Sequence, residues 1–155
     1  SQRWLMAVAA AALFAIGAAF GALALRGGAD ETAQSPEGVL EYAGPISGTG
    51  GSGELSVVEI GIGRVVDFTT NELEILPTGE FYEVWFVGPG DAPSTPNRIS
   101  AGTFHPAPDG TSDVSFTAAV NPALYPTVEV TAEPGDGNPA ATGQVVLSVE
   151  IPPTE

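Results

Sequence analysis

The chain has 155 residues, of which 19 are acidic and only four are basic (all arginine), so its formal net charge is −15. A surface of this charge repels nucleic acid phosphates and argues against direct DNA or RNA binding. The chain has no cysteine, which excludes disulfides, thiolate metal sites and cysteine nucleophiles.

An uncharged apolar segment, WLMAVAAAALFAIGAAFGALAL, covers residues 4–25 between Arg3 and Arg26. As a helix it would be about 33 Å long, enough to cross a bilayer core of about 30 Å. We therefore predict a transmembrane α-helix within residues 1–26. A cleaved signal peptide is the alternative, because residues 22–24 read Ala-Leu-Ala. The length of the apolar run and Arg26 at its far end favour a retained helix.

Two features of this segment bear on topology and function. No basic residue follows Arg26 until Arg64, and a region poor in lysine and arginine is compatible with translocation. We expect the N-terminus inside the cell and the remainder outside. Gly17 and Gly21 form a GxxxG motif, which permits close helix packing and locally weakens a helix. They mark a possible helix-packing or intramembrane cleavage region.

Residues 27–38, GGADETAQSPEG, are small, polar and acidic, which is typical of a flexible juxtamembrane linker. Strand patterns bounded by glycine and proline follow it. They cover residues 39–43, 54–60, 63–69, 72–75, 80–87, 99–104, 112–117, 127–133 and 144–151. The glycine-rich segment 48–53 is expected to be a loop. The pattern predicts an all-β domain over residues 39–152, an antiparallel Ig-like β-sandwich of about eight or nine strands.

The segment EFYEVWFV (80–87) differs from the other predicted strands because it is apolar on both faces. One face carries Tyr82, Val84 and Phe86, and the other carries Phe81, Trp85 and Val87. This predicts a central strand covered on both sides, and not an aromatic platform for a ligand. Glu83 is the polar interruption. Because an unpaired buried carboxylate is costly, we expect it near the edge of the cover or paired with Arg64 or Arg98.

Residues suited to catalysis are scarce. His105 is the sole imidazole, and its place before Pro106 predicts a loop histidine at a strand end, not a catalytic base. Asp109, Asp113 and Asp136 have the chemistry for Ca²⁺, but PDG and GDG are ordinary turn sequences. The sequence lacks the common phosphate-loop, metalloprotease and hydrolase motifs. We therefore expect no enzyme activity, no cofactor and no metal, and a binding, sensing or structural module instead.

Three segments resemble one family in their order and spacing: LPTGEFYEVWFV (76–87), SAGTFHPAPDG (100–110) and TVEVTAEPGDGNPAATGQVVLS (127–148). They are similar to the extracytoplasmic C-terminal domain of the anti-sigma-K factor family, the membrane-anchored RskA-like anti-sigma factors. The matching positions are Leu76, Pro77, Gly79, Tyr82, Trp85, Ala101, Gly102, Phe104, Thr131, Glu133, Pro134, Gly137, Thr142 and Gly143. The chain departs from the family pattern at Asp136 and Ala141, where the family tends to have glycine and proline.

The resemblance implies a single-pass protein of the bacterial cell membrane with an extracytoplasmic regulatory domain. In such proteins a cytoplasmic N-terminal domain, which is not in this chain, holds an extracytoplasmic-function sigma factor inactive. Release resembles regulated intramembrane proteolysis by membrane proteases. We expect a first cut in the linker 27–38, whose backbone is the least protected, and a second near Gly17 and Gly21. The implied partners are the sigma factor, the lipid bilayer and the membrane proteases.

A different function stays open at this point. If the resemblance reflects the fold alone, the chain is a membrane-anchored surface β-sandwich that binds a glycan or a protein partner.

Overall fold

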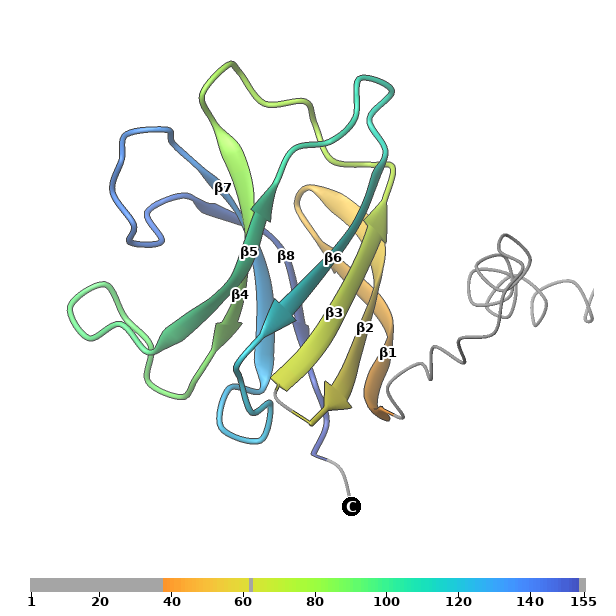
Figure 1. Cartoon of the computed structure of the whole chain (residues 1–155). Coiled ribbons are helices and arrows are strands. Elements are labelled where there is room, and N and C mark those ends of the chain that lie inside the picture. Colours follow the sequence, from red (N-terminus) through yellow and green to blue (C-terminus); the bar gives the residue numbers. More distant parts are fainter. Residues whose placement is uncertain (1–37, 62, 154–155) are drawn as a thin grey trace, which may run out of the picture. The chain divides into compact units, whose positions relative to one another are not determined.

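The structure is a computed structural model that describes residues 38–61 and 63–153. Every regular element in this part of the chain is a β-strand (Figure 1). The strands are β1 (Val39–Gly48), β2 (Gly51–Ile60), β3 (Gly63–Thr70), β4 (Phe81–Val87), β5 (Arg98–Phe104), β6 (Ser112–Ala118), β7 (Thr127–Glu133) and β8 (Gln144–Glu150). Each strand pairs with its neighbours antiparallel. The prediction of an all-β antiparallel domain with about eight strands is confirmed.

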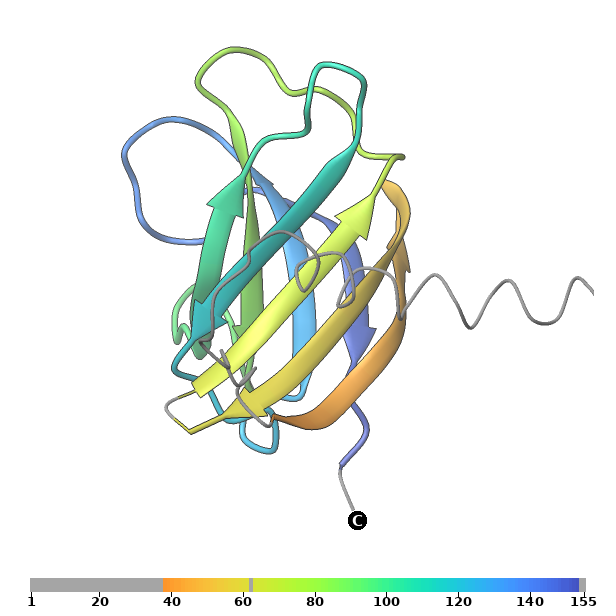
Figure 2. The ribbon, with the colours of Figure 1, turned by 45° about the vertical axis from the view of Figure 1, so that its right-hand side comes forward.

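The eight strands form one sheet in the order β5-β4-β7-β8-β1-β2-β3-β6. Its two halves, β5-β4-β7-β8 and β1-β2-β3-β6, are joined where Ser47 of β1 pairs with Ser148 of β8. The end strands β5 and β6 lie side by side, with Gly102 against the ring of Phe116, so the sheet is nearly closed (Figures 1 and 2).

This arrangement corrects the expectation of an Ig-like sandwich, which consists of two separate sheets. Here the ten-residue β1 pairs with β2 along its whole length and reaches β8 near its far end. A single long strand therefore links the two layers that the alternation of apolar residues predicted.

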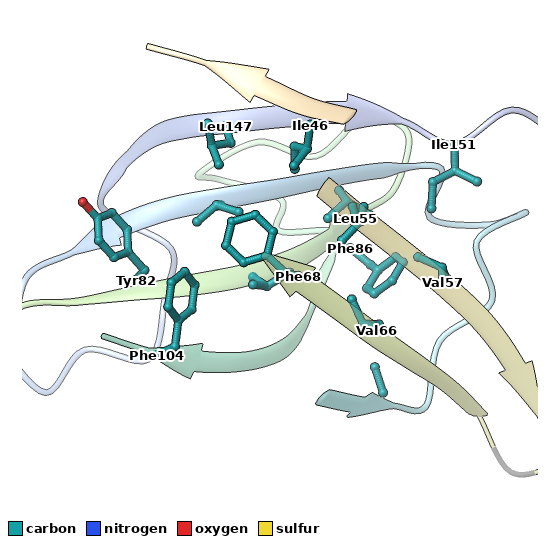
Figure 3. Close-up of a cluster of buried hydrophobic side chains, with 14 of the residues drawn as sticks. Ile46, Leu55, Val57, Val66, Phe68, Tyr82, Phe86, Phe104, Leu147 and Ile151 are labelled. Atoms are coloured by element: carbon teal, nitrogen blue, oxygen red, sulfur yellow. The ribbon is translucent and has the colours of Figure 1, made fainter. Parts of the chain in front are cut away.

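The core lies between the two halves of the sheet. Phe68 of β3 packs against Phe104 of β5, and Phe104 stacks on Tyr82 of β4, with ring centroids 5.5 Å apart in both pairs (Figure 3). The largest fully buried apolar side chains are Ile46, Val57, Val66, Phe68, Val84, Phe86, Val128, Val130 and Leu147. Burial of a side chain of this size contributes roughly 2 kcal/mol. Both halves therefore depend on the same apolar cluster.

Two predicted local structures differ from those observed. The segment 48–53 is not an open loop: β1 and β2 continue into it, and only Thr49 and Gly50 form the turn. The predicted strand 72–75 is absent, and residues 71–80 connect β3 to β4 without a strand. Leu73 alone of these four residues is buried, so the segment is fixed by one side chain and forms no ladder.

The predicted membrane helix lies outside the described residues, as do Gly17, Gly21 and all of the predicted linker except Gly38. Within the described part of the chain, no helix has the length and hydropathy needed to span a bilayer.

Candidate binding site: a pocket over Trp85

Strand β4 separates the core from the candidate site. Tyr82, Val84 and Phe86 lie in the core cluster, as the alternation predicts. Trp85 alternates with them and therefore points to the outer face of the sheet, where only 6% of its surface is exposed. The prediction that β4 is covered on both sides is confirmed, because loops and charged side chains cover Trp85.

Arg98 forms the centre of this cover. It lies on β5, and its guanidinium carbon is 5.7 Å from the centroid of the Trp85 ring. One side of the guanidinium pairs with Asp91 of the β4–β5 loop, and Nη1 lies 3.3 Å from Glu129 Oε2 on β7. Arg98 therefore reaches over Trp85 and connects two strands that are not neighbours. A cation over an indole face in this geometry contributes about 0.5–2 kcal/mol.

The polar edge of Trp85 is also satisfied. Its indole Nε1–H donates to Thr131 Oγ1 at 3.0 Å, and Thr131 is 1% exposed. A buried indole N–H without a partner would be costly. The bond fixes the ring on the outer face of the β4–β7 pair.

Two loops bracket the Trp85 side chain. The β4–β5 loop (88–97) and the β7–β8 loop (134–143) leave opposite ends of the β4–β7 pair, because these strands run antiparallel. Both fold onto the outer side of this half, at the left of Figures 1 and 2. They enclose a pocket of about 400 Å³, defined here as the Trp85 pocket. Its lining residues are Trp85, Asp91, Ala92, Pro93, Pro96, Arg98, Pro139, Ala140, Ala141 and Thr142.

Asp91 shapes the first loop. Its Oδ1 accepts a hydrogen bond of 2.7 Å from the backbone N–H of Asn97, and both carboxylate oxygens accept from Arg98. The hydrogen bonds with Arg98 are the main reason that the pKa of the Asp91 carboxyl lies below its usual value. Asp91 therefore stays charged at neutral pH and holds the loop closed.

Glu133 shapes the second loop. It ends β7 and is 3% exposed, and its Oε2 accepts from the backbone N–H groups of Thr142 at 3.0 Å and Gly143 at 2.8 Å. These contacts hold the end of the loop, at Thr142 and Gly143, next to Glu133, which directly precedes the loop. Glu133 Oε1 has no hydrogen-bond partner among the described residues. The carboxylate therefore anchors the β7–β8 loop through one oxygen, while its other oxygen is buried without a hydrogen bond among the described residues.

One of the two alternatives for Glu83, an ion pair with Arg64 or Arg98, was wrong. Glu83 Oε1 accepts a hydrogen bond of 2.5 Å from Ser100 Oγ on β5, and it pairs with neither arginine. Burial raises the pKa of the Glu83 carboxyl, the Ser100 hydrogen bond opposes this, and the charge of Glu133 raises the pKa further. Glu83 is half-buried, which agrees with the other alternative from the sequence, a position near the edge of the cover.

Arg64 is engaged in the other half of the sheet. It lies on β3 and makes two hydrogen bonds of 2.8 Å to Glu41, and its Nη2 lies 3.3 Å from Glu59. Glu41 occupies the irregular position of β1, where the register with β2 shifts between Leu40 and Tyr42. This shift explains why sequence spacing did not identify the pair.

The other polar residues singled out from the sequence have local roles. His105 is exposed and directly follows β5, as predicted. Asp109 accepts from the backbone N–H of Thr111 at 3.1 Å, and Asp136 accepts from that of Asn138 at 2.8 Å. Asp113 is exposed on β6. Within residues 38–61 and 63–153, these carboxylates do not join a cluster that could hold a metal ion.

The family model described as anti-sigma-K factor rskA, C-terminal, matches residues 4–145. The chain belongs to this family. The search of curated proteins and the search of solved structures found no match to this chain. An anti-sigma factor family is regulatory, not enzymatic.

Five of the positions that carry the RskA-like resemblance line the pocket or support it. Trp85 and Thr131 bond to each other, and Glu133 binds Thr142 and Gly143. The hydroxyl of Tyr82 donates to the backbone oxygen of Glu74 at 2.8 Å, which ties down the β3–β4 connection. The motif is therefore chiefly a set of structural anchors for β4 and the β7–β8 loop.

The pocket itself was not predicted. The sequence identified both lining segments as loops, but the interpretation of β4 as a core strand excluded it from any binding surface. The available signal was the proline and alanine content of the segments 88–97 and 133–143, which follow strands paired side by side. Trp85 alone of the β4 aromatics lines the pocket, while Tyr82 remains in the core.

Proposed function

We propose that this chain is the membrane anchor and extracytoplasmic regulatory domain of an anti-sigma factor that controls an extracytoplasmic-function sigma factor. The observation that carries the proposal is the family match over residues 4–145, which includes the apolar segment and the β domain up to the beginning of β8. In this scheme the sigma factor is bound by a cytoplasmic domain N-terminal to the apolar segment. The β domain takes no part in that contact.

Charge supports the proposed topology. Residues 1–26 carry two arginines and no acid, a charge of +2, whereas residues 27–155 carry two arginines and 19 acids, a charge of −17. Lysine and arginine are retained preferentially on the cytoplasmic side of a membrane. A domain with so few basic residues is suited to export, and we place it outside the bacterial cell membrane after a single span.

We further propose that proteolysis releases the sigma factor. The first cut falls in the linker 27–38, which is polar and acidic and shows no strand pattern. The second falls in the span near Gly17 and Gly21, where glycine weakens the helix. The β domain then acts as a gatekeeper whose state decides whether the first protease reaches the linker.

The test is co-purification of the full-length protein from the membranes of its own cells, followed by mass spectrometry of what it retains. We expect a sigma factor. The 155-residue chain with the same tag is the matched control and should retain none. A sigma factor retained by the control, or none retained by the full-length protein, would overturn the proposal that a cytoplasmic domain and not the β domain binds the sigma factor.

A second experiment tests release. The full-length protein carries a tag at each end, and fragments are mapped after the cells are stressed. We expect a membrane fragment that ends within residues 27–38 and then a shorter cytoplasmic fragment. A first cut within residues 39–152 would contradict the proposal.

The Trp85 pocket favours a second candidate function, which is ligand binding outside the cell. Stacking of a glycan on this tryptophan is disfavoured, because Arg98 lies over the ring and the residue is 6% exposed. A ligand must instead contact the pocket walls.

A further inference from the structure

The walls and charges of the Trp85 pocket indicate what kind of ligand it accepts. We propose that it binds a small organic cation with an apolar body, such as an arylalkylamine. The inference does not depend on the proposed anti-sigma role, since a pocket on this domain would bind the same ligand in either function.

The size and walls of the pocket suit a small apolar body. Its volume of about 400 Å³ lies within the range of about 300–1,000 Å³ that is usual for small-molecule sites. Pro93 and Pro96 line it from one loop, and Pro139, Ala140 and Ala141 line it from the other. Proline and alanine lose little side-chain entropy when they are covered. A ligand with an aromatic or aliphatic body can therefore bury apolar surface here at small entropic cost.

The charges around the pocket select a cation. Arg98 is paired with both Asp91 and Glu129, so the three residues together carry one net negative charge. Both carboxylate oxygens of Asp91 accept hydrogen bonds from Arg98, and Oδ1 also accepts one from the backbone N–H of Asn97. An anion could therefore bind Arg98 only by displacing Asp91. Glu129 is not itself a lining residue, but its Oε2 lies 3.3 Å from Arg98 Nη1, so the excess negative charge stands next to the pocket wall that Arg98 forms.

The charge of the whole domain acts in the same direction. Four of the 19 acids (Asp30, Glu31, Glu37 and Glu155) lie outside the described residues, which leaves 15 acids in the described part. Its two arginines, Arg64 and Arg98, are both paired with carboxylates. A field of this sign attracts cations and repels anions over distances near the Debye length.

The test uses three probes with similar phenyl bodies and different charges: 2-phenylethylamine, 2-phenylethanol and 3-phenylpropanoate. Each is titrated into the ¹⁵N-labelled 155-residue chain in nonionic detergent micelles. The readouts are the indole N–H of Trp85 and the backbone amides of Ala141 and Thr142. The indole N–H of Trp4, in the apolar segment, reports partition of a probe into the micelle. We expect the amine to bind about tenfold more tightly than the propanoate, with the alcohol between them.

Two variants and a matched control locate the site. Ala140→Arg adds bulk and positive charge to the exposed pocket wall while the backbone bond from Ala140 N–H to Asn138 is kept. It should abolish amine binding. Ala107→Arg makes the same change at an exposed alanine of the β5–β6 connection and should leave binding unchanged. Glu129→Gln keeps an acceptor for Arg98 but removes the excess charge, so it should reduce the preference for the amine over the alcohol.

Several results would overturn the proposal. Equal affinity for the three probes would show that charge plays no part. Shifts in Trp4 without shifts in Trp85 and Thr142 would show partition into detergent alone. Equal loss of binding in Ala107→Arg and Ala140→Arg would place the effect away from the pocket.

Discussion

Trp85 and Thr131 lie on neighbouring strands, and the indole N–H of the first donates to the hydroxyl of the second at 3.0 Å, with both residues almost fully buried. The bond aligns the floor of the pocket with the strand that also carries Glu129 and Glu133. Because the two loops close over this floor, the orientation of one indole ring is linked to the position of both loops.

Thr131→Val tests this bond. Valine has nearly the same shape and suits a strand, but it leaves the indole N–H of Trp85 without an acceptor in a buried site. We expect the free energy of unfolding to fall by about 1–3 kcal/mol, measured by equilibrium urea unfolding. The Trp85 indole resonance should move as well. Thr131→Ser keeps the hydroxyl and should preserve the resonance. Similar shifts in both variants would mean that the hydrogen bond is not the cause.

Glu133→Ala and Glu133→Gln separate charge from hydrogen bonding in the β7–β8 loop. Alanine removes the acceptor of the Thr142 and Gly143 amides, and we expect a loss of roughly 3 kcal/mol because both bonds are to a charged group. Hydrogen exchange at these two amides should become faster. Glutamine keeps a carbonyl oxygen for them and should preserve most of their protection. Equally fast exchange of these amides in both variants would show that the loop requires the charge of Glu133.

Glu83→Gln tests pH dependence on the same face. The pKa of Glu83 is raised above its ordinary value of 4.5 by burial, so the folded protein binds this proton more readily than the unfolded chain. The contribution of this bound proton to the free energy of unfolding is fully present below pH 4.5, and it is lost as the pH rises through the raised pKa. Glutamine resembles the protonated acid and can still accept from Ser100. We expect the variant to melt higher than the native chain at pH 7, with the difference vanishing near pH 4. A constant difference across this range would be the contrary result.

Asp91→Asn should show the opposite dependence. The pKa of Asp91 lies below its ordinary value of 3.8, so its ion pair stabilises the fold above pH 3.8, and this contribution is lost as the pH falls through the lowered pKa. Asparagine keeps an oxygen for the backbone N–H of Asn97 but loses the charge that binds Arg98, so we expect this amide to exchange faster in the variant at pH 7. In the native chain the same acceleration should appear only on strong acidification. An unchanged Asn97 amide in the variant would show that the loop is held by other contacts.

Gly143→Ala tests the close approach of the β7–β8 loop to β7. A Cβ at Gly143 would overlap the backbone oxygen of Ala132, which cannot move without breaking the ladder. Overpacking of this kind costs about 1–3 kcal/mol. Gly61→Ala is the matched control, because a Cβ there meets nothing within 4 Å. The two variants should differ clearly in thermal midpoint, and equal midpoints would mean that the loop relaxes freely.

The strand content of the domain was accessible from sequence because alternation of apolar side chains reports burial directly. Val128 and Val130 of β7, and Val114 and Phe116 of β6, show this pattern without ambiguity. The pattern fails where side chains are missing. Gly51 and Gly53 lie in β2, but glycine has no side chain whose polarity could indicate a buried or an exposed face of a strand. The hairpin was therefore expected to be a loop.

The pairing of charged residues was not accessible in the same way. Register shifts at Glu41, at Ala101 and at Val146 change which side chains oppose each other, and such shifts have no sequence signature here. Arg98 was a reasonable partner for Glu83, since both lie on adjacent strands. It binds Asp91 and Glu129 instead, because a loop brings Asp91 back onto β5. The pocket arises from the same fold-back of loops, so local periodicity does not reveal it.

The two half-sheets are joined through the single residue pair Ser47 and Ser148, whereas neighbouring strands within each half share six to nine residue pairs. Strand β1 is held along one edge by β2, and its first residues, Val39 and Leu40, are 62% and 59% exposed. The chain enters the domain at this strand. The half that contains β1 is therefore joined to β8 through one residue pair, while β4, β7 and β8 are paired with one another over six or seven residue pairs. The strand that follows the proposed cleavage region is the one that holds the two halves of the sheet together.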